Sequence, residues 1–223
     1  FARPSVRMKG ICINCHSFPQ RDPSALTIHT RGDITTTIIA TGSGISRTDM
    51  SAKMVYTCWH PDRSVIAFST NRIRQVFHMA RTEIRDVIDE DSDLGLYILE
   101  SNSFLSDPAI ARPDRLETYP CWAPDGKTLF FSSAPKLFDS LAEIETQVFR
   151  EIRYDLMKVA YDPGTRRFGR PEVVLSSAET GMSIVQPKVS PDGRFLLFCM
   201  CPYGCFPVYQ PESDLYLMDL RTG

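Results

Sequence analysis

The chain has 223 residues, enough to bury a sizeable core in one domain, and its content of 43% hydrophobic and 23% charged residues is that of an ordinary globular protein. Its formal net charge of -2 gives no basic bias, which excludes nucleic acid and anionic membrane surfaces as expected partners. No run approaches the roughly 18 apolar residues of a membrane-spanning helix, so we expect no transmembrane segment.

The ends of the chain and its cysteines add two constraints. The sequence opens on Phe1, shows no signal peptide and stops at Gly223 just after a strand pattern. We interpret it as a segment of a longer protein, so the missing targeting sequence says little about location. Seven cysteines, an odd number, argue against a complete disulfide framework.

The first motif along the chain is Cys12-Ile13-Asn14-Cys15-His16, which matches the C-x-x-C-H pattern of covalent haem attachment. The spacing has a chemical reason, because two thiols add to the two vinyl groups of the porphyrin and the adjacent histidine becomes an axial ligand of the iron. The motif predicts a haem c bound through Cys12 and Cys15, with His16 as the metal ligand.

The second axial position of such a haem has several candidates. His29 is close to the motif in sequence, and His78 lies in an insertion further along. The alternatives are an open position or one of four methionines: Met8, Met50, Met54 and Met79. The motif also has other interpretations. Cys12 and Cys15 match half of a zinc site, for which His29 is a nearby partner, or a simple thiol or disulfide pair.

Residues 1–50 are predicted to form an N-terminal segment with the haem-type motif and a first β-hairpin. Within it, Gly42-Ser43-Gly44 resembles a phosphate-binding loop only superficially, because neither a Lys-Ser/Thr pair nor a helix follows. We therefore predict a hairpin turn at these glycines. Residues 51–223 are predicted to form a second domain built on a repeat.

The repeat is a turn motif that occurs three times, as Trp59-His60-Pro61-Asp62, Trp122-Ala123-Pro124-Asp125 and Val189-Ser190-Pro191-Asp192. An apolar strand pattern follows each copy, over residues 65–69, 128–132 and 195–198. Proline presets φ and aspartate bonds its own backbone, so each copy predicts a β-hairpin. We interpret His60 as a structural turn residue, because Ala123 and Ser190 occupy the same repeat position.

Further strands complete each repeat unit. A third strand pattern follows each hairpin, over 92–97, 154–159 and 213–218, and a fourth strand is predicted over 171–175. Four antiparallel strands make one blade of a propeller. The predicted fold class is therefore all-β, a β-propeller that is incomplete in this chain, with about three four-stranded blades, because a closed propeller needs about four or more.

Long insertions separate the second and third strands of each unit, at 71–91, 134–153 and 201–212. The first two contain helix-compatible stretches, such as 141–150. Insertions on one face of a rigid scaffold commonly hold binding residues. We therefore expect a protein or glycan partner on this insertion face.

Other candidate sites are weaker. Asp89, Asp91, Asp93 and Glu100 have the spacing of positions 1, 3, 5 and 12 of a calcium loop. Leu94 replaces the glycine at position 6, so a solvated acidic insertion is the better interpretation. Three clustered cysteines predict a disulfide or a soft-metal site: Cys199, Cys201 and Cys205. Because no G-x-S-x-G nucleophile elbow or Ser-His-Asp set is recognisable, we do not expect an enzyme.

Several stretches together resemble a known family: 12–18, 28–31, 59–62, 66–71, 74–78 and 117–122. They are similar to envelope proteins of Bacteroidetes-type bacteria with TolB-like (WD40-like, PD40) propeller repeats behind a C-x-N-C-H segment. The resemblance covers the chain from about Gly10 to its end, and His16, His29 and His78 fall on matching segments. It implies export to the periplasm or cell envelope and no established reaction. The three clustered cysteines depart from the family pattern.

The sequence thus predicts a non-enzymatic envelope β-propeller with a covalent c-type haem, for electron transfer or binding, and with a redox partner. Its expected cofactor-binding residues are Cys12, Cys15, His16, His29 and His78. The alternative is a TolB-like protein-interaction scaffold without haem, in which Cys12 and Cys15 are a thiol or disulfide pair. An accessory domain of an enzyme whose catalytic part lies outside this segment ranks third.

Overall fold

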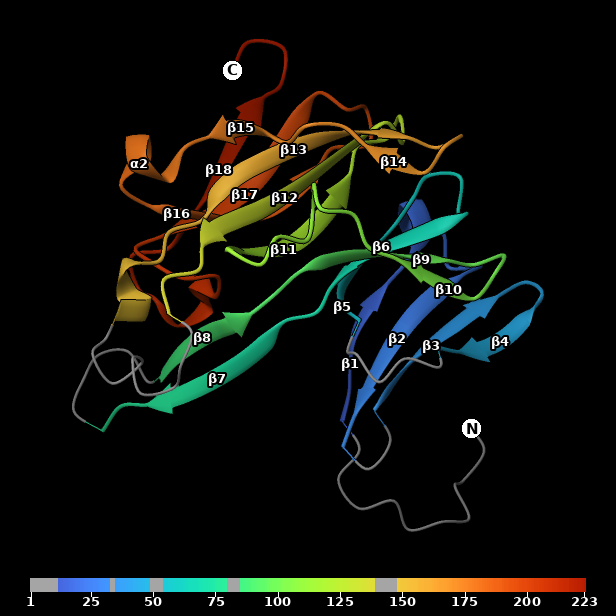
Figure 1. Cartoon of the computed structure of the whole chain (residues 1–223), viewed down its shortest axis with the longest axis horizontal. Helices are drawn as coiled ribbons and strands as arrows, with labels where there is room; N and C mark the ends of the chain where they lie inside the picture. Colours follow the sequence, from blue (N-terminus) through green and yellow to red (C-terminus); the bar gives the residue numbers. More distant parts are fainter. Residues whose placement is uncertain (1–11, 33–34, 49–53, 80–84, 139–147) are drawn as a thin grey trace.

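The computed structural model describes residues 12–32, 35–48, 54–79, 85–138 and 148–223. These residues form four antiparallel sheets that follow one another along the chain, with one extra hairpin (Figure 1). We number the four sheets blades 1 to 4. In Figure 1 blade 1 is blue at the lower right, and blade 4 is orange to red at the top. The all-β propeller class predicted from the repeat is confirmed.

Blades 1 and 2 each contain four strands. Blade 1 consists of β1 (Cys12–Ser17), β2 (Leu26–Arg31), β3 (Thr36–Thr41) and β4 (Gly44–Arg47). Blade 2 consists of β5 (Val55–Trp59), β6 (Val65–Ser69), β9 (Leu94–Ile98) and β10 (Ser103–Leu105). The hairpin inserted into blade 2 consists of β7 (Arg72–Phe77) and β8 (Arg85–Asp91).

Blades 3 and 4 complete the described sheets. Blade 3 consists of β11 (Arg115–Trp122), β12 (Thr128–Pro135) and β13 (Asp155–Asp162), and β13 pairs with both β14 (Arg167–Phe168) and β15 (Glu172–Leu175). Blade 4 consists of β16 (Ser183–Val189), β17 (Phe195–Cys201) and β18 (Asp214–Asp219). The described helices are short: 3₁₀ turns at Pro19–Arg21, Val148–Glu151 and Pro207–Tyr209, and α2 (Ser177–Thr180).

The Pro-Asp turns behave as the repeat predicts. Each joins the first two strands of its blade, β5 to β6, β11 to β12 and β16 to β17. The predicted third strands correspond to β9, β13 and β18, and the predicted fourth strand over 171–175 corresponds to β15. The turn predicted at Gly42-Ser43-Gly44 joins β3 to β4. These predictions are confirmed.

Two expectations differ from the structure. The N-terminal segment contains more than a first hairpin, because β1 to β4 form a complete four-stranded sheet whose strand β1 lies against β5. The proposed boundary after residue 50 falls outside the described residues. The first insertion, in which we expected helix-compatible stretches, is the β7–β8 hairpin.

The core lies between blades rather than inside one sheet. Each pair of consecutive blades shares one apolar cluster, and each cluster joins residues of both partners. Blades 1 and 2 share Ile39, Trp59 and Ile66; blades 2 and 3 share Leu96, Leu129 and Phe131; blades 3 and 4 share Leu156, Ile184 and Leu196. Burying one such side chain contributes about 1.5–3 kcal/mol, so these interfaces fix the order of the blades.

The β7–β8 hairpin leaves blade 2 and reaches the segments that flank blades 3 and 4, at the lower left of Figure 1. Asp86 of β8 anchors it with three bonds: from Tyr203 Oη to Oδ1 at 2.5 Å, from Arg150 Nη2 to Oδ2 at 2.9 Å, and to His78 Nε2 at 2.6 Å. Burial raises the pKa of Asp86, but the bonds from Tyr203, Arg150 and His78 outweigh it and lower the pKa.

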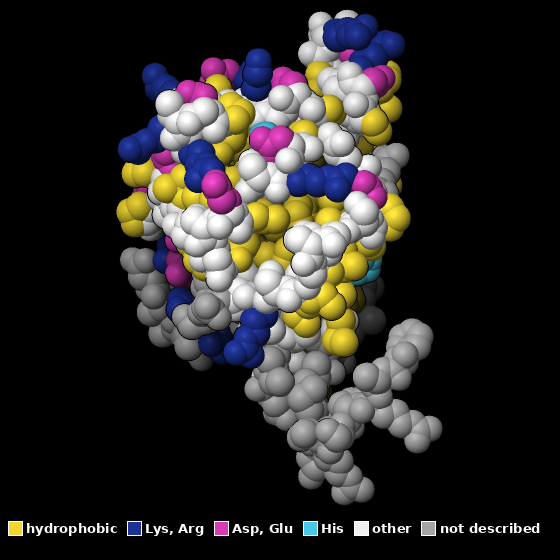
Figure 2. All heavy atoms as spheres, turned by 90° about the vertical axis from the view of Figure 1, so that its right-hand side faces the viewer, with side chains coloured by type: hydrophobic (Ala, Val, Ile, Leu, Met, Phe, Trp, Pro, Cys, Tyr) yellow, Lys and Arg dark blue, Asp and Glu magenta, His cyan; other side chains and the backbone are white. Residues whose placement is uncertain are grey.

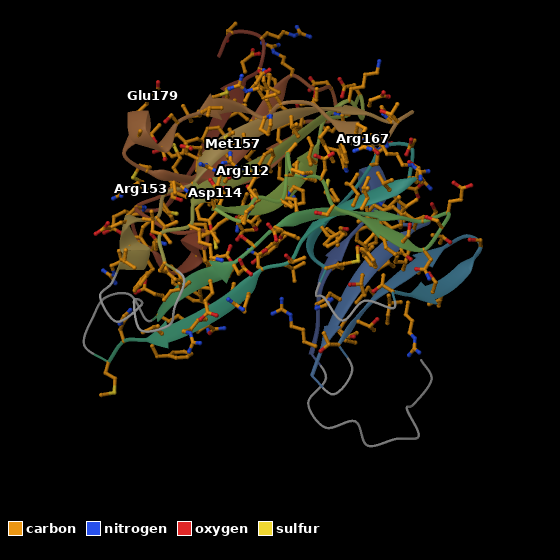
Figure 3. The ribbon with its side chains drawn as sticks, in the orientation of Figure 1. Arg112, Asp114, Arg153, Met157, Arg167 and Glu179 are labelled. Carbon is orange, nitrogen blue, oxygen red and sulfur yellow. The ribbon has the colours of Figure 1, made fainter. Side chains whose placement is uncertain are left out.

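Polar contacts also order the outer side of blade 3. Figure 3 shows Arg112 beside Asp114 at the entry to β11, and their guanidinium and carboxylate groups are 2.7 Å apart. The same view shows Arg153 near α2, which carries Glu179. Arg153 Nε donates to the carbonyl of Gly181 at 3.0 Å, where α2 ends.

None of the helices among the described residues has the length and apolar character needed to cross a membrane.

Candidate functional site

The innermost strands of blades 2, 3 and 4 share one backbone irregularity. Each has a β-bulge against the next strand, and the bulge contains a non-glycine residue with positive φ: Tyr56 at 50°, Tyr119 at 57° and Gln186 at 59°. Such a backbone is uncommon for non-glycine residues, so its occurrence in three blades marks a recurrent structural device. A bulge turns the residues that follow it, which determines what these strands present to the centre.

A groove runs along these innermost strands and β1. It consists of two adjoining cavities of about 690 and 430 Å³ that share Lys188 and Leu197 in their walls, and we call it the central groove. The larger cavity is bordered by Phe18, Trp59 and Trp122, among others. Most of the wall of the smaller cavity is apolar or aromatic, formed by Tyr56, Tyr119, Leu197, Phe198 and Leu215 among others. Its polar groups include His16 and Gln186. Such a concave, mainly apolar site is typical of ligand binding.

His16 is the one cofactor-binding candidate of the haem-type motif whose side chain is described. It is exposed in the wall of the smaller cavity, and its ring meets the ring of Phe18 edge-on at 5.8 Å. The next residue, Ser17, is firmly held: its Oγ lies 2.8 Å from Thr27 Oγ1 and 2.7 Å from Thr57 Oγ1. Trp59 Nε1 also donates to the Ser17 carbonyl at 3.3 Å. Blade 2 therefore positions the strand that carries His16.

The motif cysteines lie on the same strand. Cys12 pairs with Arg31 of β2 in the backbone register, and the register shifts by one residue between Asn14 and Ser17, so Cys15 lies in a bulge. The side chains of both cysteines are outside the described part of the structure. The motif thus lies on a paired inner strand beside the central groove.

His29 lies opposite Asn14 on β2, which brings it to the same part of blade 1 as the motif. Its side chain is only 1% exposed, and its Nδ1 lies 3.1 Å from Thr37 Oγ1 on β3. The ring is therefore packed within blade 1. Cofactor binding by His29 would require this packing to open.

His78 is not brought to the motif. It follows β7 at the outer end of the inserted hairpin, and its Nε2 lies 2.6 Å from Asp86 Oδ2. Of the candidate methionines, Met54 is fully buried in the core between blades 1 and 2, and Met79 is fully exposed. Met8 and Met50 lie outside the described residues. The predicted ligand candidates therefore separate into different regions of the molecule.

The structure brings together three residues that sequence reasoning did not connect. Cys58, Cys121 and Lys188 occupy equivalent positions, two residues after the positive-φ residue of the bulge, and all three line the larger cavity. Each thiol accepts a backbone N–H from the following blade, Trp122 to Cys58 and Val189 to Cys121, both at 3.4 Å. One feature of the sequence could have connected the two cysteines: Cys58 and Cys121 each directly precede the tryptophan of their repeat.

Two of the buried carboxyl groups have a pKa above the usual range. Burial raises the pKa of Asp89 to about 6, although Ser92, Tyr154 and Asn71 hydrogen-bond it. Burial also raises the pKa of Glu117 to about 8. Asp89 accepts from Tyr154 Oη at 3.1 Å and from Asn71 Nδ2 at 2.8 Å, so it links the hairpin to blade 3. Its role in this network is structural.

The weaker candidate sites do not assemble. Among the described residues no group of three or more His, Cys, Asp or Glu side chains could hold a metal ion. Glu100 is exposed and pairs with Arg166 instead. Cys199, Cys201 and Cys205 are free thiols rather than the expected disulfide; Cys201 is buried with its Sγ 3.4 Å from the Tyr203 carbonyl. Burial raises the pKa of Cys201 to about 12, which makes it an inert core residue.

The face turned to the viewer in Figure 2 has hydrophobic side chains across its middle, with Lys and Arg interspersed with Asp and Glu around them. This is the right-hand side of Figure 1, where β4 and β10 lie, and Ile45 and Phe104 are exposed on those strands. Charges of both signs are mixed on this face. It therefore offers no single-sign patch for nucleic acid.

The chain matches no protein-family model. No curated protein matches its sequence either. Solved structures do match. Prolyl oligopeptidase B from Galerina marginata is 12% identical, with a TM-score of 0.52 over 94% of this chain and 29% of that chain. A putative TolB from Agrobacterium tumefaciens is 13% identical, with a TM-score of 0.42 over 95% of this chain and 78% of that one. The tricorn protease is 9% identical, with a TM-score of 0.41 over 94% and 25%.

The chain therefore spans less than a third of the prolyl oligopeptidase and tricorn chains. Identities of 9 to 13% are too low to transfer an activity, because one fold hosts many unrelated functions. The likeness to the prolyl oligopeptidase, together with the blade order described above, establishes that this chain has a β-propeller-like fold.

Proposed function

We propose that this chain is a non-enzymatic propeller scaffold of the bacterial envelope that binds a c-type haem at the edge of its central groove. The observation that carries the proposal is the position of His16, exposed on the wall of an apolar cavity of about 430 Å³ on the strand that also contains Cys12 and Cys15. A porphyrin is a flat, largely apolar group, and such a wall would shield one of its faces.

The residues present fit this group. Thioether bonds from Cys12 and Cys15 would fix it to β1, and His16 would bind the iron, which supplies one-electron redox chemistry or a site for a small ligand. Tyr56, Tyr119 and Phe198 would exclude water from the apolar face. Ser17, through its bonds to Thr27 and Thr57, would hold the strand in place.

The described histidines favour binding over electron transfer. The ring of His29 is held against Thr37, and the ring of His78 is held against Asp86. These contacts direct neither ring toward His16. We infer that His16 would hold the iron, and that a haem held in this way would supply a site for a small ligand.

A second candidate function is favoured by the pairing of β1, the strand that carries the motif. In this alternative the chain is a TolB-like interaction scaffold without haem, Cys12 and Cys15 form a thiol or disulfide pair, and a protein or glycan partner binds the insertion face. The supporting observation is that the motif lies on a strand paired with β2, where the backbone already has structural contacts.

Visible spectra separate the two candidates. The chain is produced in a host with haem-attachment machinery and compared with its Cys12→Ser/Cys15→Ser variant. We expect a Soret band and the mass increment of one haem in the parent chain, and neither in the variant. His16→Ala should change the reduced spectrum, whereas His29→Ala and His78→Ala should not. A parent chain without Soret band or added mass would leave the scaffold as the better proposal.

Location is tested separately. We propose export to the periplasm, because covalent haem attachment and the resemblance described above both belong to that compartment. Fractionation of cells that express the full-length gene should recover the protein with periplasmic or envelope markers. Recovery with cytoplasmic markers would contradict both the location and the haem proposal.

A further inference from the structure

The repeat itself creates a row of reactive side chains in the larger cavity of the central groove. Cys58 in blade 2, Cys121 in blade 3 and Lys188 in blade 4 each follow a bulge residue and threonine or proline, as Tyr-Thr-Cys, Tyr-Pro-Cys and Gln-Pro-Lys. Because the bulge is the same in all three strands, the three side chains leave their strands in equivalent positions. Neighbouring blades therefore present them side by side.

Hydrogen bonds between blades place the two cysteines next to one another. The N–H of Trp122, the residue after Cys121, donates to Cys58 Sγ at 3.4 Å. The N–H of Val189, the residue after Lys188, donates to Cys121 Sγ in the same way at 3.4 Å. Both cysteines are free.

The surroundings make the two thiols unequal. The neighbouring Cys58 thiol lowers the pKa of Cys121, and the charge of Lys188 and the Val189 N–H lower it further against the effect of burial. The same contact with Cys121, together with burial, raises the pKa of Cys58 well above its usual value. Of the two thiols, Cys121 is therefore the one that loses its proton more readily.

Access comes through the central groove. Cys58 and Cys121 both line its larger cavity of about 690 Å³, in which Cys58 is half-buried and Cys121 is 5% exposed. This opening admits a small oxidant and restricts large ones. The other cysteine near the groove, Cys199, lines the smaller cavity, and burial raises its pKa.

We propose that Cys58 and Cys121 form a redox-active dithiol that is oxidised by a small hydroperoxide to a disulfide between blades 2 and 3. The Cys121 thiolate attacks one oxygen of hydrogen peroxide; an S–O bond forms, the O–O bond breaks, and the hydroxide that leaves is protonated to water. The Cys58 sulfur then attacks Cys121; the S–S bond forms, the S–O bond breaks, and a second water leaves. The two thiols supply both electrons, and a dithiol reductant reverses the reaction.

Lys188 is a positioning residue in this reaction. Its ammonium group stabilises the Cys121 thiolate without touching the peroxide bond. Lys188→Met keeps most of the side-chain volume and removes the charge, so it should slow peroxide oxidation by about threefold to tenfold. The experiment measures the rate at which peroxide consumes the Cys121 thiol at several pH values. In the Lys188→Met variant this rate and its pH dependence should approach those of an ordinary thiol.

The test uses the whole chain with Cys12→Ser and Cys15→Ser, so that no haem can react with peroxide and failure here is distinct from failure of the haem proposal. A small excess of hydrogen peroxide should reduce the intact mass by two hydrogens and link the tryptic peptides 54–63 and 116–127. With Cys58→Ser added, dimedone should label Cys121 as the sulfenic acid.

Cys199→Ser is the matched control, because Cys199 also borders the groove but lies apart from the pair; it should leave the rate and the linked peptides unchanged. Circular dichroism confirms that each variant is folded. The proposal is overturned if peroxide leaves Cys58 and Cys121 fully alkylatable in the folded chain. It is equally overturned if dimedone labels Cys199 in preference to Cys121 in the Cys58→Ser variant.

Discussion

The junction between blades 2 and 3 differs from the junction between blades 3 and 4, although both are built from the same turn. His60, Ala123 and Ser190 occupy one repeat position. His60 reaches across to the next turn, with Nε2 donating to the Gly126 carbonyl at 2.8 Å and its ring edge-on to Trp122 at 4.8 Å. Ala123 cannot reach the turn at Gly193, whose nearest neighbour is Pro124. The same backbone repeat thus forms a polar, aromatic junction between blades 2 and 3 and an apolar junction between blades 3 and 4.

Gly126 gives the strongest test of this difference. Gly126 and Gly193 have nearly the same φ, +68° and +72°, but a Cβ on Gly126 would lie 2.6 Å from His60 Nε2, whereas one on Gly193 would lie 3.9 Å from its nearest neighbour. We expect Gly126→Ala to lower the free energy of unfolding by about 3–4 kcal/mol and Gly193→Ala by about 1–2 kcal/mol. Urea unfolding of the two variants measures both values.

The double variant His60→Ala/Gly126→Ala sharpens that result. Removal of the imidazole should eliminate the clash, so that Gly126→Ala in this background costs no more than Gly193→Ala. If the two glycine variants are equally stable in the parent chain, the junctions do not differ in the way described here.

Glu117 breaks the pattern at a second repeat position. It corresponds to Met54 in blade 2 and Ile184 in blade 4, and all three are at most 1% exposed. Because burial raises the pKa of Glu117 to about 8, the folded chain holds a proton that the unfolded chain releases above about pH 4.5. The free energy of unfolding should therefore fall as pH rises from about 5 to 8, by roughly 2–3 kcal/mol.

Glu117→Gln should flatten this pH dependence between about pH 6 and 8, and unfolding curves at each pH measure it. Glu172→Gln, at an exposed position of β15, is the matched control and should leave the slope unchanged. A parent chain that becomes more stable over this range would contradict the assignment. Part of the slope below pH 6 belongs to Asp89, whose pKa is about 6.

His60→Ala probes the junction contacts directly. It converts this repeat position into the residue found in blade 3, and it removes the bonds to Gly126 and Asp62 as well as the contact with Trp122. We expect a loss of about 2 kcal/mol in the free energy of unfolding. Thermal unfolding followed by tryptophan fluorescence reports both the stability and the environment of Trp122. An unchanged midpoint would show that the apolar contacts alone hold blades 2 and 3.

Ser190→Ala should have the smallest effect. The Ser190 hydroxyl bonds to Asp192 within its own turn and accepts from the Phe195 N–H at 2.8 Å, but it does not join two blades. The expected loss is about 0.5–1 kcal/mol, the usual range for one partly exposed hydrogen bond. Urea unfolding at constant pH measures it beside His60→Ala. A loss as large as that of His60→Ala would contradict the distinction between local and inter-blade contacts.

The sequence predicts those blades whose turns have a local signal. Pro61-Asp62, Pro124-Asp125 and Pro191-Asp192 each specify a hairpin through the conformation of a few residues, and all three were found. Blade 1 has no such turn, and its strands join through other loops, so only part of it was anticipated. The first insertion was misread: β7 and β8 pair with one another, and their anchor Asp86 has its partners Arg150 and Tyr203 outside the insertion.

The candidate site was predicted in part for the same reason. The haem-type motif is a local pattern, but the proximity of Cys58 and Cys121 depends on how two strands 63 residues apart in sequence align through their bulges. His78 appeared suitable as a ligand because its bond to Asp86 forms only when the hairpin folds. A pattern in one segment carries no information about a partner supplied by another.

The anchor of the β7–β8 hairpin has a consequence for the synthesis of the chain. Asp86 and Tyr203 are separated by 117 residues. At about 5–20 residues per second, a ribosome needs roughly 6–23 s to add that length. After it leaves the ribosome, the hairpin therefore lacks its final partner for a time of this order, so the carboxylate of Asp86 and the apolar residues of β7 are open to chaperones. Nascent chains that end before residue 203 should therefore be more sensitive to protease at the hairpin than chains that end after it.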